Sequence, residues 1–376
     1  MTVRLGQKFK LVCDLQYGST GKGLIAGVLA EHWMPQVVMT AWSANAGHTY
    51  IDSKRRKYQH TMVANGIVSS ELQYLMIGPG SCLNLESLRN ELIGIKNRLP
   101  SCFQGVLIHE NAAVISEMHR IQESDAMNKI GSTKKGVGAC MIEKIQRQDA
   151  KSIIAWGHKK EIARIARECG IKIVVVDNVR WNLCWSAFDR VMIEGAQGFS
   201  LGINSGFYPY VTSRECTPAQ MLSDLLLPVD IDIEVIGCMR TFPIRVANRY
   251  DKDGNQIGTS GPFYDDQREL DWENDLGIQP ELTTVTKLPR RIATFSLSQA
   301  RDAIRAVRPD VIFLNFCNYL DNRQQVTDLI SRIEGMMTTY KRSSQGVRYL
   351  GFGPEYRDVF DCHGGQSVEG VERYRS

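Results

Sequence analysis

Short apolar, β-branched runs alternate with amphipathic segments along most of this chain. Each run suits one buried strand, and each amphipathic segment has the spacing of a helix with one apolar face. Because strand–helix–strand units join parallel neighbours, this alternation predicts an α/β fold with a mainly parallel central sheet, flanking helices and inserted subdomains. The predicted strands are Phe9–Leu15, Val37–Thr40, Val106–His109, Ile171–Val176, Arg190–Glu194, Ile231–Ile236, Val311–Asn315 and Val347–Gly351. The predicted helices include Leu24–Trp33, Leu83–Lys96, Ala112–Ile121 and Lys160–Cys169.

The chain shows neither an internal repeat nor a low-complexity linker. We therefore expect one continuous domain over residues 1–376. A polar, turn-rich segment at about residues 248–289 interrupts the strand–helix alternation. Its Asp251–Asn255 stretch, with the sequence DKDGN, favours a hairpin, and a mobile loop is expected after it.

Composition narrows the classes of function. The formal net charge is only +4, from 45 Lys and Arg against 41 Asp and Glu. Nucleic-acid binding needs a concentrated basic surface, and no run reaches the length that spans a membrane, so neither partner is expected. The ten cysteines form no CxxC pair, which favours reduced thiols in a cytoplasmic protein. The small positive net charge is compatible with a small anionic ligand.

The glycine-rich turn Gly18–Gly23, with the sequence GSTGKG, lies between a predicted strand and a predicted helix. It is not a Walker A loop, because Gln16 stands where the first glycine belongs and Gly23 where a hydroxyl residue belongs. Backbone N–H groups and Lys22 at a helix N-terminus still suit an anion. The alternative is a plain strand-to-helix turn with a surface lysine.

Four further stretches combine small residues with polar groups. Ala44–Thr49 allows close backbone approach and carries His48, although such a histidine is more often a turn residue. Lys129–Gly138 gathers hydroxyls, amides and lysines as phosphate sites do, or else is a solvated basic loop. Glu194–Gly198 follows a predicted strand, where open α/β sheets bind ligands, and is otherwise a tight turn. Tyr208–Ser213 follows it.

Together these stretches resemble the adenylosuccinate synthetase family, in order along most of the chain. Any one match would be weak, whereas five ordered matches are specific. The matching segments are Gly18–Gly23, Asn45–Thr49, Ile130–Gly138, Glu194–Gly198 with Tyr208–Ser213, and Gly351–Pro354. The resemblance implies a two-step reaction. A nucleoside triphosphate phosphorylates the 6-oxygen of a purine nucleotide, and the amine of L-aspartate then displaces that phosphate.

The resemblance also implies which residues act. The catalytic group comprises Ser19, Lys22, His48 and Gln197. The nucleoside triphosphate would bind at Thr20, Gly21, Lys22, Gly23, Gly47, His48, Thr49, Asn318, Gly351, Gly353 and Pro354. The purine monophosphate would bind at Ser19, Asn45, Ala46, Ile130, Ser132, Thr133, Arg147, Gln197, Leu201 and Thr212. Arg147 would act from a second subunit, which implies a homodimer. Mg²⁺ would bind at Ser19 and the Gly47 carbonyl.

Ser19 departs from the family's pattern. The typical turn is Gly-Asp-Glu-Gly-Lys-Gly, whose aspartate takes the N1 proton of IMP and binds magnesium. Here Ser19 and Thr20 replace both acids, and a hydroxyl is neither a comparable base nor a charged ligand. The exchange frees space and removes charge beside the N1–C2 edge, which favours the 2-amino group of guanine. The pattern resembles the viral branch of the family, the 2-aminoadenylosuccinate synthetases, which convert dGMP to N6-succino-2-amino-2'-deoxyadenylate for diaminopurine DNA.

Two other departures concern the phosphoryl donor and aspartate. Where the family reads the guanine of GTP with Lys-x-Asp, this chain has Asn315-Phe-Cys-Asn318, so we expect ATP or dATP. The family's aspartate loop resembles residues 285–291, which implies aspartate binding by Val285, Thr286, Arg290 and Arg291. Leu288 stands in place of an arginine, which suits a 2'-deoxyribose. The alignment of this loop with the family's pattern is open by a residue or two, since Thr283-Thr284 also matches the two threonines of that pattern.

Two other functions stay open at this level. One is an ordinary adenylosuccinate synthetase that acts on IMP, and the other is an inactive nucleotide-binding homologue. The acceptor of the N1 proton is also open between the substrate phosphate, the incoming aspartate and water. A viral enzyme of this kind would work in the host cytoplasm.

Overall fold

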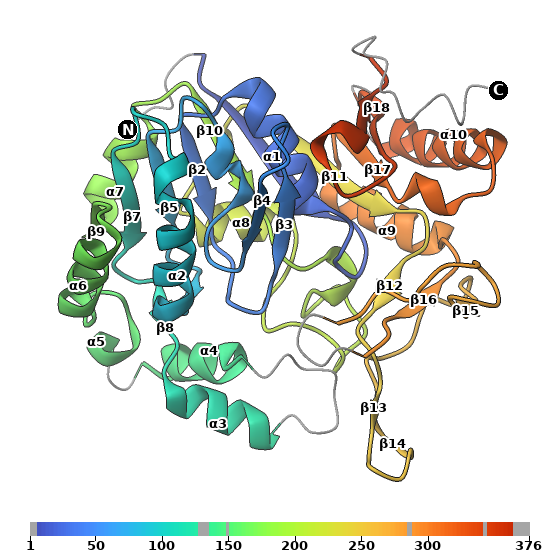
Figure 1. Cartoon of the computed structure of the whole chain (residues 1–376), viewed down its shortest axis with the longest axis horizontal. Coiled ribbons are helices and arrows are strands. Elements are labelled where there is room, and N and C mark those ends of the chain that lie inside the picture. Colours follow the sequence, from blue (N-terminus) through green and yellow to red (C-terminus); the bar gives the residue numbers. More distant parts are fainter. Residues whose placement is uncertain (1–5, 127–134, 148–149, 284–287, 341–343, 364–376) are drawn as a thin grey trace.

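A ten-stranded sheet runs through the computed structural model, which describes residues 6–126, 135–147, 150–283, 288–340 and 344–363 (Figure 1). Neighbouring strands are parallel except at one edge, where β19 runs antiparallel to β18. In spatial order the strands are β19 (Val359–Asp361), β18 (Gly346–Gly351), β17 (Val311–Asn315), β11 (Ile233–Arg240), β1 (Lys8–Asp14), β10 (Arg190–Glu194), β2 (Val37–Thr40), β5 (Tyr74–Ile77), β7 (Gly105–His109) and β9 (Ile173–Val176).

Helices cover both faces of this sheet. Successive strand residues point to opposite faces, so in β1 Val12 joins one apolar cluster while Leu11 and Cys13 join the other. The first cluster includes α1 (Lys22–Trp33), α2 (Leu85–Ile95) and α6 (Lys159–Cys169). The second includes α7 (Asn178–Trp185), α8 (Pro218–Asp224), α9 (Leu297–Val307) and α10 (Arg323–Tyr340). The result is a three-layer α/β/α arrangement, as the sequence predicts.

All eight strands expected from the sequence are present in the ten-stranded sheet, in which β5 and β19 are additional. The expected helix Ala112–Ile121 is wrong at its start. Ala113–Val114 instead form β8, which pairs with β6 (Cys82–Leu83), because the Ile115 N–H donates to the Leu83 carbonyl at 2.8 Å. Helix α3 (Glu117–Ala126) begins after this bridge and lies beside α4 (Val137–Gln146), below the sheet in Figure 1. The short α5 (Ala150–Ile153) contacts α4.

The polar segment at 248–289 leaves the main sheet. Its expected hairpin is confirmed, with β13 (Arg249–Tyr250) paired to β14 (Gln256–Gly258). The loop expected after it is more ordered than predicted. There β15 (Glu269–Leu270) joins β12 (Ile244–Arg245) and β16 (Arg291–Ala293) in a three-stranded sheet, because Leu270 and Trp272 bury their apolar surface against Ile244 and Ile292.

One more hairpin lies against α1. It pairs β3 (His48–Ile51) with β4 (Lys57–His60). A Cβ at Gly27 of α1 would lie 2.4 Å from the Tyr50 ring, so this glycine lets the helix pack closely on the hairpin. Among the described helices, none has the length and apolar composition required to span a membrane.

Candidate active site

Most of the described residues expected at the site follow the carboxyl ends of six adjacent strands. Because parallel strands end at one edge of a sheet, segments far apart in sequence meet there. The six strands are β18, β17, β11, β1, β10 and β2.

The glycine-rich turn after β1 has an unusual backbone. Gly18, Ser19 and Gly21 have φ angles of 87°, 56° and 94°. A Cβ at Gly21 would lie 2.2 Å from Asn315 Nδ2, so only glycine fits there. That amide donates to the Thr20 carbonyl at 3.1 Å and fastens the turn to the end of β17. Within the part of the chain that the structure describes, the start of α1 at Gly21 has no side-chain cap, which leaves its first N–H groups available to an anion.

Lys22 is buried rather than a surface residue, with 5% of its surface exposed. Its Nζ donates to Asp14 Oδ2 at 2.9 Å and to the Gln197 carbonyl at 2.6 Å. The lysine therefore connects the turn after β1 with the turn after β10. This arrangement supports the anion-binding interpretation over that of a plain turn.

His48 and Glu194 form a buried pair. His48 Nδ1 lies 2.6 Å from Glu194 Oε1. The other carboxylate oxygen accepts from the N–H groups of Asn65 at 2.7 Å and Gly66 at 3.3 Å. The Trp42 ring packs on the imidazole with a centroid separation of 4.2 Å. Since the carboxylate accepts from Nδ1, Nε2 is the imidazole nitrogen available to a ligand.

Gln197, which is expected to contact the purine, follows β10 and reaches the segment after β2. Its Nε2 donates to Asn45 Oδ1 at 2.8 Å. This hydrogen bond joins two residues that are expected to bind the purine nucleotide. Its Oε1 is buried without a partner among the described residues. A buried acceptor of this kind is costly unless a ligand satisfies it. Nearby, the Thr212 N–H donates to the Leu201 carbonyl at 2.7 Å.

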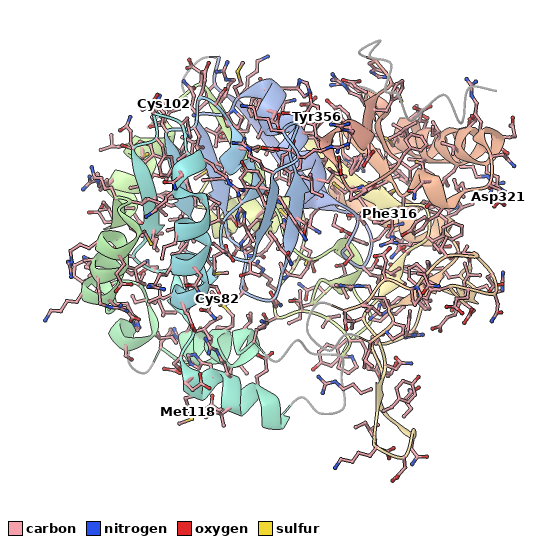
Figure 2. All side chains as sticks on the ribbon, in the orientation of Figure 1. Cys82, Cys102, Met118, Phe316, Asp321 and Tyr356 are labelled. Atoms are coloured by element: carbon pink, nitrogen blue, oxygen red, sulfur yellow. The ribbon has the colours of Figure 1, made fainter. Side chains whose placement is uncertain are left out.

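Ser19 is exposed, and its carbonyl accepts from Arg240 Nη1 at 3.1 Å. Arg240 is fully buried, and its Nη2 donates to Glu281 at 2.5 Å. The guanidinium also lies over the Phe316 ring, 3.8 Å from its centroid (labelled in Figure 2). Arg240 thus ties Ser19 to the segment that precedes the expected aspartate loop.

The ends of that loop are held together. The Thr283 N–H donates to the Leu288 carbonyl at 2.9 Å, while Val285 and Thr286 lie outside the described residues. Burial and the charge of Arg240 lower the pKa of Arg290, and Glu281 opposes this effect. Arg291 is already engaged, since it pairs with Glu269 at 2.6 Å.

The remaining expected residues are mostly exposed or lie outside the described part. Asn318 is exposed in a 3-10 turn (Cys317–Tyr319) after β17, and Gly351 ends β18 beside it. Gly353 lies against Asp358, and Pro354 follows it. Gly47 and Thr49 are exposed and Ala46 is buried beside His48. Arg147 is exposed at the end of α4. Ile130, Ser132 and Thr133 lie outside the described residues.

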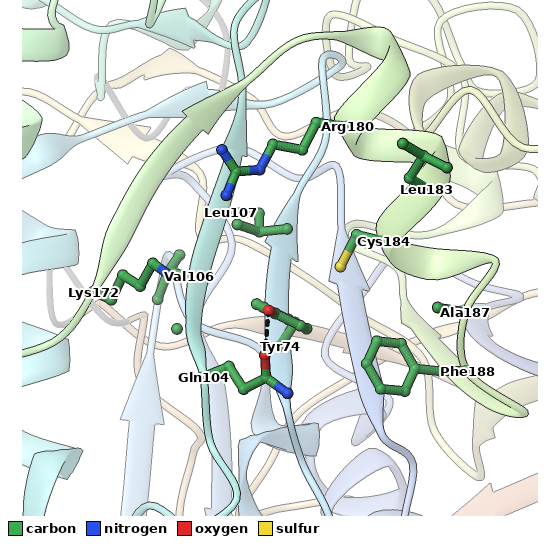
Figure 3. Close-up of a pocket in the computed structure, with 11 residues that line it drawn as sticks. Tyr74, Gln104, Val106, Leu107, Lys172, Arg180, Leu183, Cys184, Ala187 and Phe188 are labelled. Carbon is green, nitrogen blue, oxygen red and sulfur yellow. Dashed lines mark hydrogen bonds between the residues drawn. The ribbon is translucent and has the colours of Figure 1, made fainter.

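A separate cavity of about 290 Å³ lies elsewhere (Figure 3). Tyr74 and Gly105, at the starts of β5 and β7, line it, together with Arg180 and Leu183 from α7. It therefore lies near the opposite ends of the strands and contains none of the expected site residues.

Comparison with known proteins agrees with this geometry. The family model described as adenylosuccinate synthetase matches residues 11–172 and 159–328. The chain belongs to the adenylosuccinate synthetase family.

Among its relatives, the N6-succino-2-amino-2'-deoxyadenylate synthase of Salmonella phage PMBT28 is 52% identical over 94% of this chain and 97% of the relative. The enzyme of the same name from Acinetobacter phage SH-Ab 15497 is 48% identical over 92% of each chain. A solved structure of cyanophage S-2L succinoaminodeoxyadenylate synthetase, bound to dGMP and dATP as an energy donor, has a TM-score of 0.82 at 38% identity, covering 94% of this chain and 95% of that one. The family and branch resemblance drawn from the sequence is confirmed.

Asp14, Arg240 and Glu281 were not expected from the sequence, although Asp14 contacts Lys22 and Arg240 joins the Ser19 carbonyl to Glu281. Asp14 and Arg240 each end a buried strand, which is a recognisable signal. Glu281 lies in the polar segment, where nothing in the local pattern marks it.

Proposed function

We propose that this chain joins L-aspartate to C6 of dGMP at the expense of ATP or dATP and yields N6-succino-2-amino-2'-deoxyadenylate. The observation that carries the proposal is the exposed Ser19 in a turn that otherwise keeps its anion-binding backbone and Lys22. A neutral, small side chain there leaves room for a 2-amino group. The phage relatives of that name and the dGMP- and dATP-bound structure support it.

In the first step the γ-phosphoryl group moves from the triphosphate to O6 of the guanine as the N1 proton leaves. Lys22 and the N–H groups of the turn offset the charge of the phosphoryl oxygens. His48 Nε2 hydrogen-bonds O6 or the phosphate, because Glu194 holds its Nδ1. In the second step the aspartate amine attacks C6, phosphate leaves with the C–O bond electrons, and the amine loses a proton. Gln197 holds the purine through both steps.

Mg²⁺ fits the residues that were expected to hold it. The Ser19 hydroxyl and the Gly47 carbonyl are hard oxygen donors on exposed residues, and a Cβ at Gly47 would meet nothing within 4 Å. Both donors are neutral, so the nucleotide phosphates would supply most of the negative charge. The ion would neutralise phosphoryl oxygens during transfer.

We also propose a homodimer in which Arg147 reaches the partner's monophosphate. Arg147 ends α4, whose Ile142 and Ile145 are 58% and 68% exposed. Met118 (labelled in Figure 2) and Ile121 of α3 are 58% and 50% exposed. Exposed apolar side chains on two adjacent helices favour burial against another protein surface, and a second copy would bring Arg147 with it.

The decisive experiment measures phosphate release and product mass with purified protein, aspartate and Mg²⁺. The monophosphate is dGMP, GMP or IMP, and the donor is ATP, dATP or GTP. We expect turnover that requires aspartate and is fastest with dGMP and an adenine nucleotide. Equal or faster turnover with IMP and GTP would overturn the proposal. Tight nucleotide binding without product would instead identify an inactive homologue.

A further inference from the structure

Asp14 is a buried carboxylate at the end of β1 to which the mechanism above assigns no role. Only 1% of its surface is exposed. Its Oδ1 accepts from the N–H groups of Gln16 at 2.8 Å and Gly18 at 3.2 Å. Its Oδ2 accepts from Thr20 Oγ1 at 2.5 Å and Lys22 Nζ at 2.9 Å. One side chain therefore contacts the turn at both its ends and in its middle.

The negative charge of Asp14 compensates the buried positive charge of Lys22. A buried ammonium without a counter-charge is costly, and the turn itself carries no acid because Ser19 and Thr20 are neutral. Asp14 supplies a carboxylate from directly behind the turn. The ion pair is almost fully buried, with side-chain exposures of 5% and 0%. Its strength therefore depends little on salt.

The geometry also sets the direction of the ammonium. Lys22 Nζ has three N–H bonds, and two of them point to Asp14 Oδ2 and the Gln197 carbonyl. Both acceptors belong to the segments that end β1 and follow β10. No described residue accepts from the third N–H, which can therefore donate to a ligand.

Asp14 also fixes the distance between those two segments. A Cβ at Gly198 would lie 2.4 Å from Asp14 Oδ1, so the backbone after Gln197 packs directly on the carboxylate. We infer that Asp14 is a positioning residue, which holds Lys22 against the Gln197 turn for phosphoryl transfer in place of the acids that the glycine-rich turn lacks. This inference rests on the proposed function.

The first test replaces Asp14 by asparagine, which keeps the shape and removes the charge. We expect kcat with dGMP, ATP and aspartate to fall about a hundredfold, because a misdirected Lys22 weakens the stabilisation of the transition state more than it weakens the binding of substrate. The KM for dGMP should change much less. Asp52→Asn is the matched control. Asp52 is 3% exposed and accepts from two backbone N–H groups and Arg56, but it lies outside the site. Its variant should lose stability and keep kcat.

The second test remains informative even if Asp14→Asn fails to fold. Lys22→Gln and the double variant Asp14→Asn/Lys22→Gln are compared with wild type, since the double variant leaves no unpaired buried charge. If Asp14 acts through Lys22, the double variant should be no slower than Lys22→Gln alone. The inference would be overturned if the kcat loss of the double variant equalled the product of the two single losses. It would also be overturned if Asp14→Asn kept the wild-type kcat. A wild type that makes no succinylated product would overturn the proposed function instead, so the two failures are distinct.

Discussion

His48 Nδ1 lies 2.6 Å from Oε1 of Glu194, and this carboxylate is held in turn by the backbone N–H of Asn65. The imidazole is therefore fixed in both position and proton placement, as histidines in catalytic pairs with carboxylates are. His48 comes from the start of β3 and Glu194 from the end of β10, so the pair exists only once the sheet has assembled.

We predict that Glu194→Gln lowers kcat by at least about tenfold, because the amide cannot stabilise positive charge on His48 as the carboxylate does. The loss should appear in kcat rather than in the KM for ATP, measured by steady-state phosphate release. Glu91→Gln offers a matched control, since Glu91 also caps backbone N–H groups, at Thr61 and Met62, outside the site. Unchanged kcat in Glu194→Gln would contradict a catalytic role for the pair.

Ser19→Asp should abolish most activity with dGMP, because the carboxylate crowds and repels the N1–C2 edge of guanine. Ser19→Asn separates size from charge, and both residues tolerate the positive φ of 56° at this position. We expect Asp to cost more than Asn with dGMP, and IMP to become the better substrate of the Asp variant. Substrate preference is read from kcat/KM for dGMP and IMP. An Asp variant that keeps full dGMP activity would refute the role of Ser19.

Removing Arg240 should loosen Ser19 and the aspartate loop together. Arg240→Met loses the contacts with the Ser19 carbonyl and Glu281, and we expect a loss of about 3 kcal/mol in the free energy of unfolding. The KM values for dGMP and aspartate should both rise. Arg190→Met removes a half-exposed pair with Glu71 and should cost less than about 1 kcal/mol by urea denaturation. Similar losses in the two variants would show that Arg240 has no special role.

The proposed dimer predicts complementation between inactive variants. Arg147→Ala and His48→Ala homodimers should each be inactive, whereas mixing them should restore activity at about a quarter of the sites after random exchange. Ile145→Asp should shift the protein to monomer in sedimentation, because it places a charge in the apolar face of α4. Absence of any recovery between freely exchanging subunits would exclude a shared site.

The lowered pKa of His60 makes the free energy of unfolding depend on pH. Burial lowers the pKa of His60 to about 4 from 6.5, although its hydrogen bond with Asn65 opposes this shift. Between these values the unfolded chain binds more protons than the folded one. The stability contribution is thus complete above pH 6.5, falls as the pH decreases and levels off below pH 4, by about 3 kcal/mol. His60→Gln should remove this component from urea melts between pH 7 and 4. Parallel pH curves for the two proteins would contradict it.

The strands and the glycine-rich turn between β1 and α1 could be predicted because their signals are local. Apolar β-branched runs need burial on both faces, which marks Val37–Thr40 and Val311–Asn315 whatever their neighbours are. The start of α3 could not be predicted, because the bridge from Ile115 to Leu83 joins segments that only the fold brings together. The binding of the substrate aspartate by Val285 and Thr286 remains a prediction, because both residues lie outside the described part of the chain.

The sequence by itself determined the α/β class, the family and the neutral Ser19, since each is written in a short stretch of residues. Only the tertiary structure decided that Lys22 is buried between Asp14 and Gln197, and that Arg240 holds the Ser19 carbonyl. The physical reason is strand order. Local patterns mark where β1, β10 and β11 run, but side chains at their ends meet because packing places β1 between the other two.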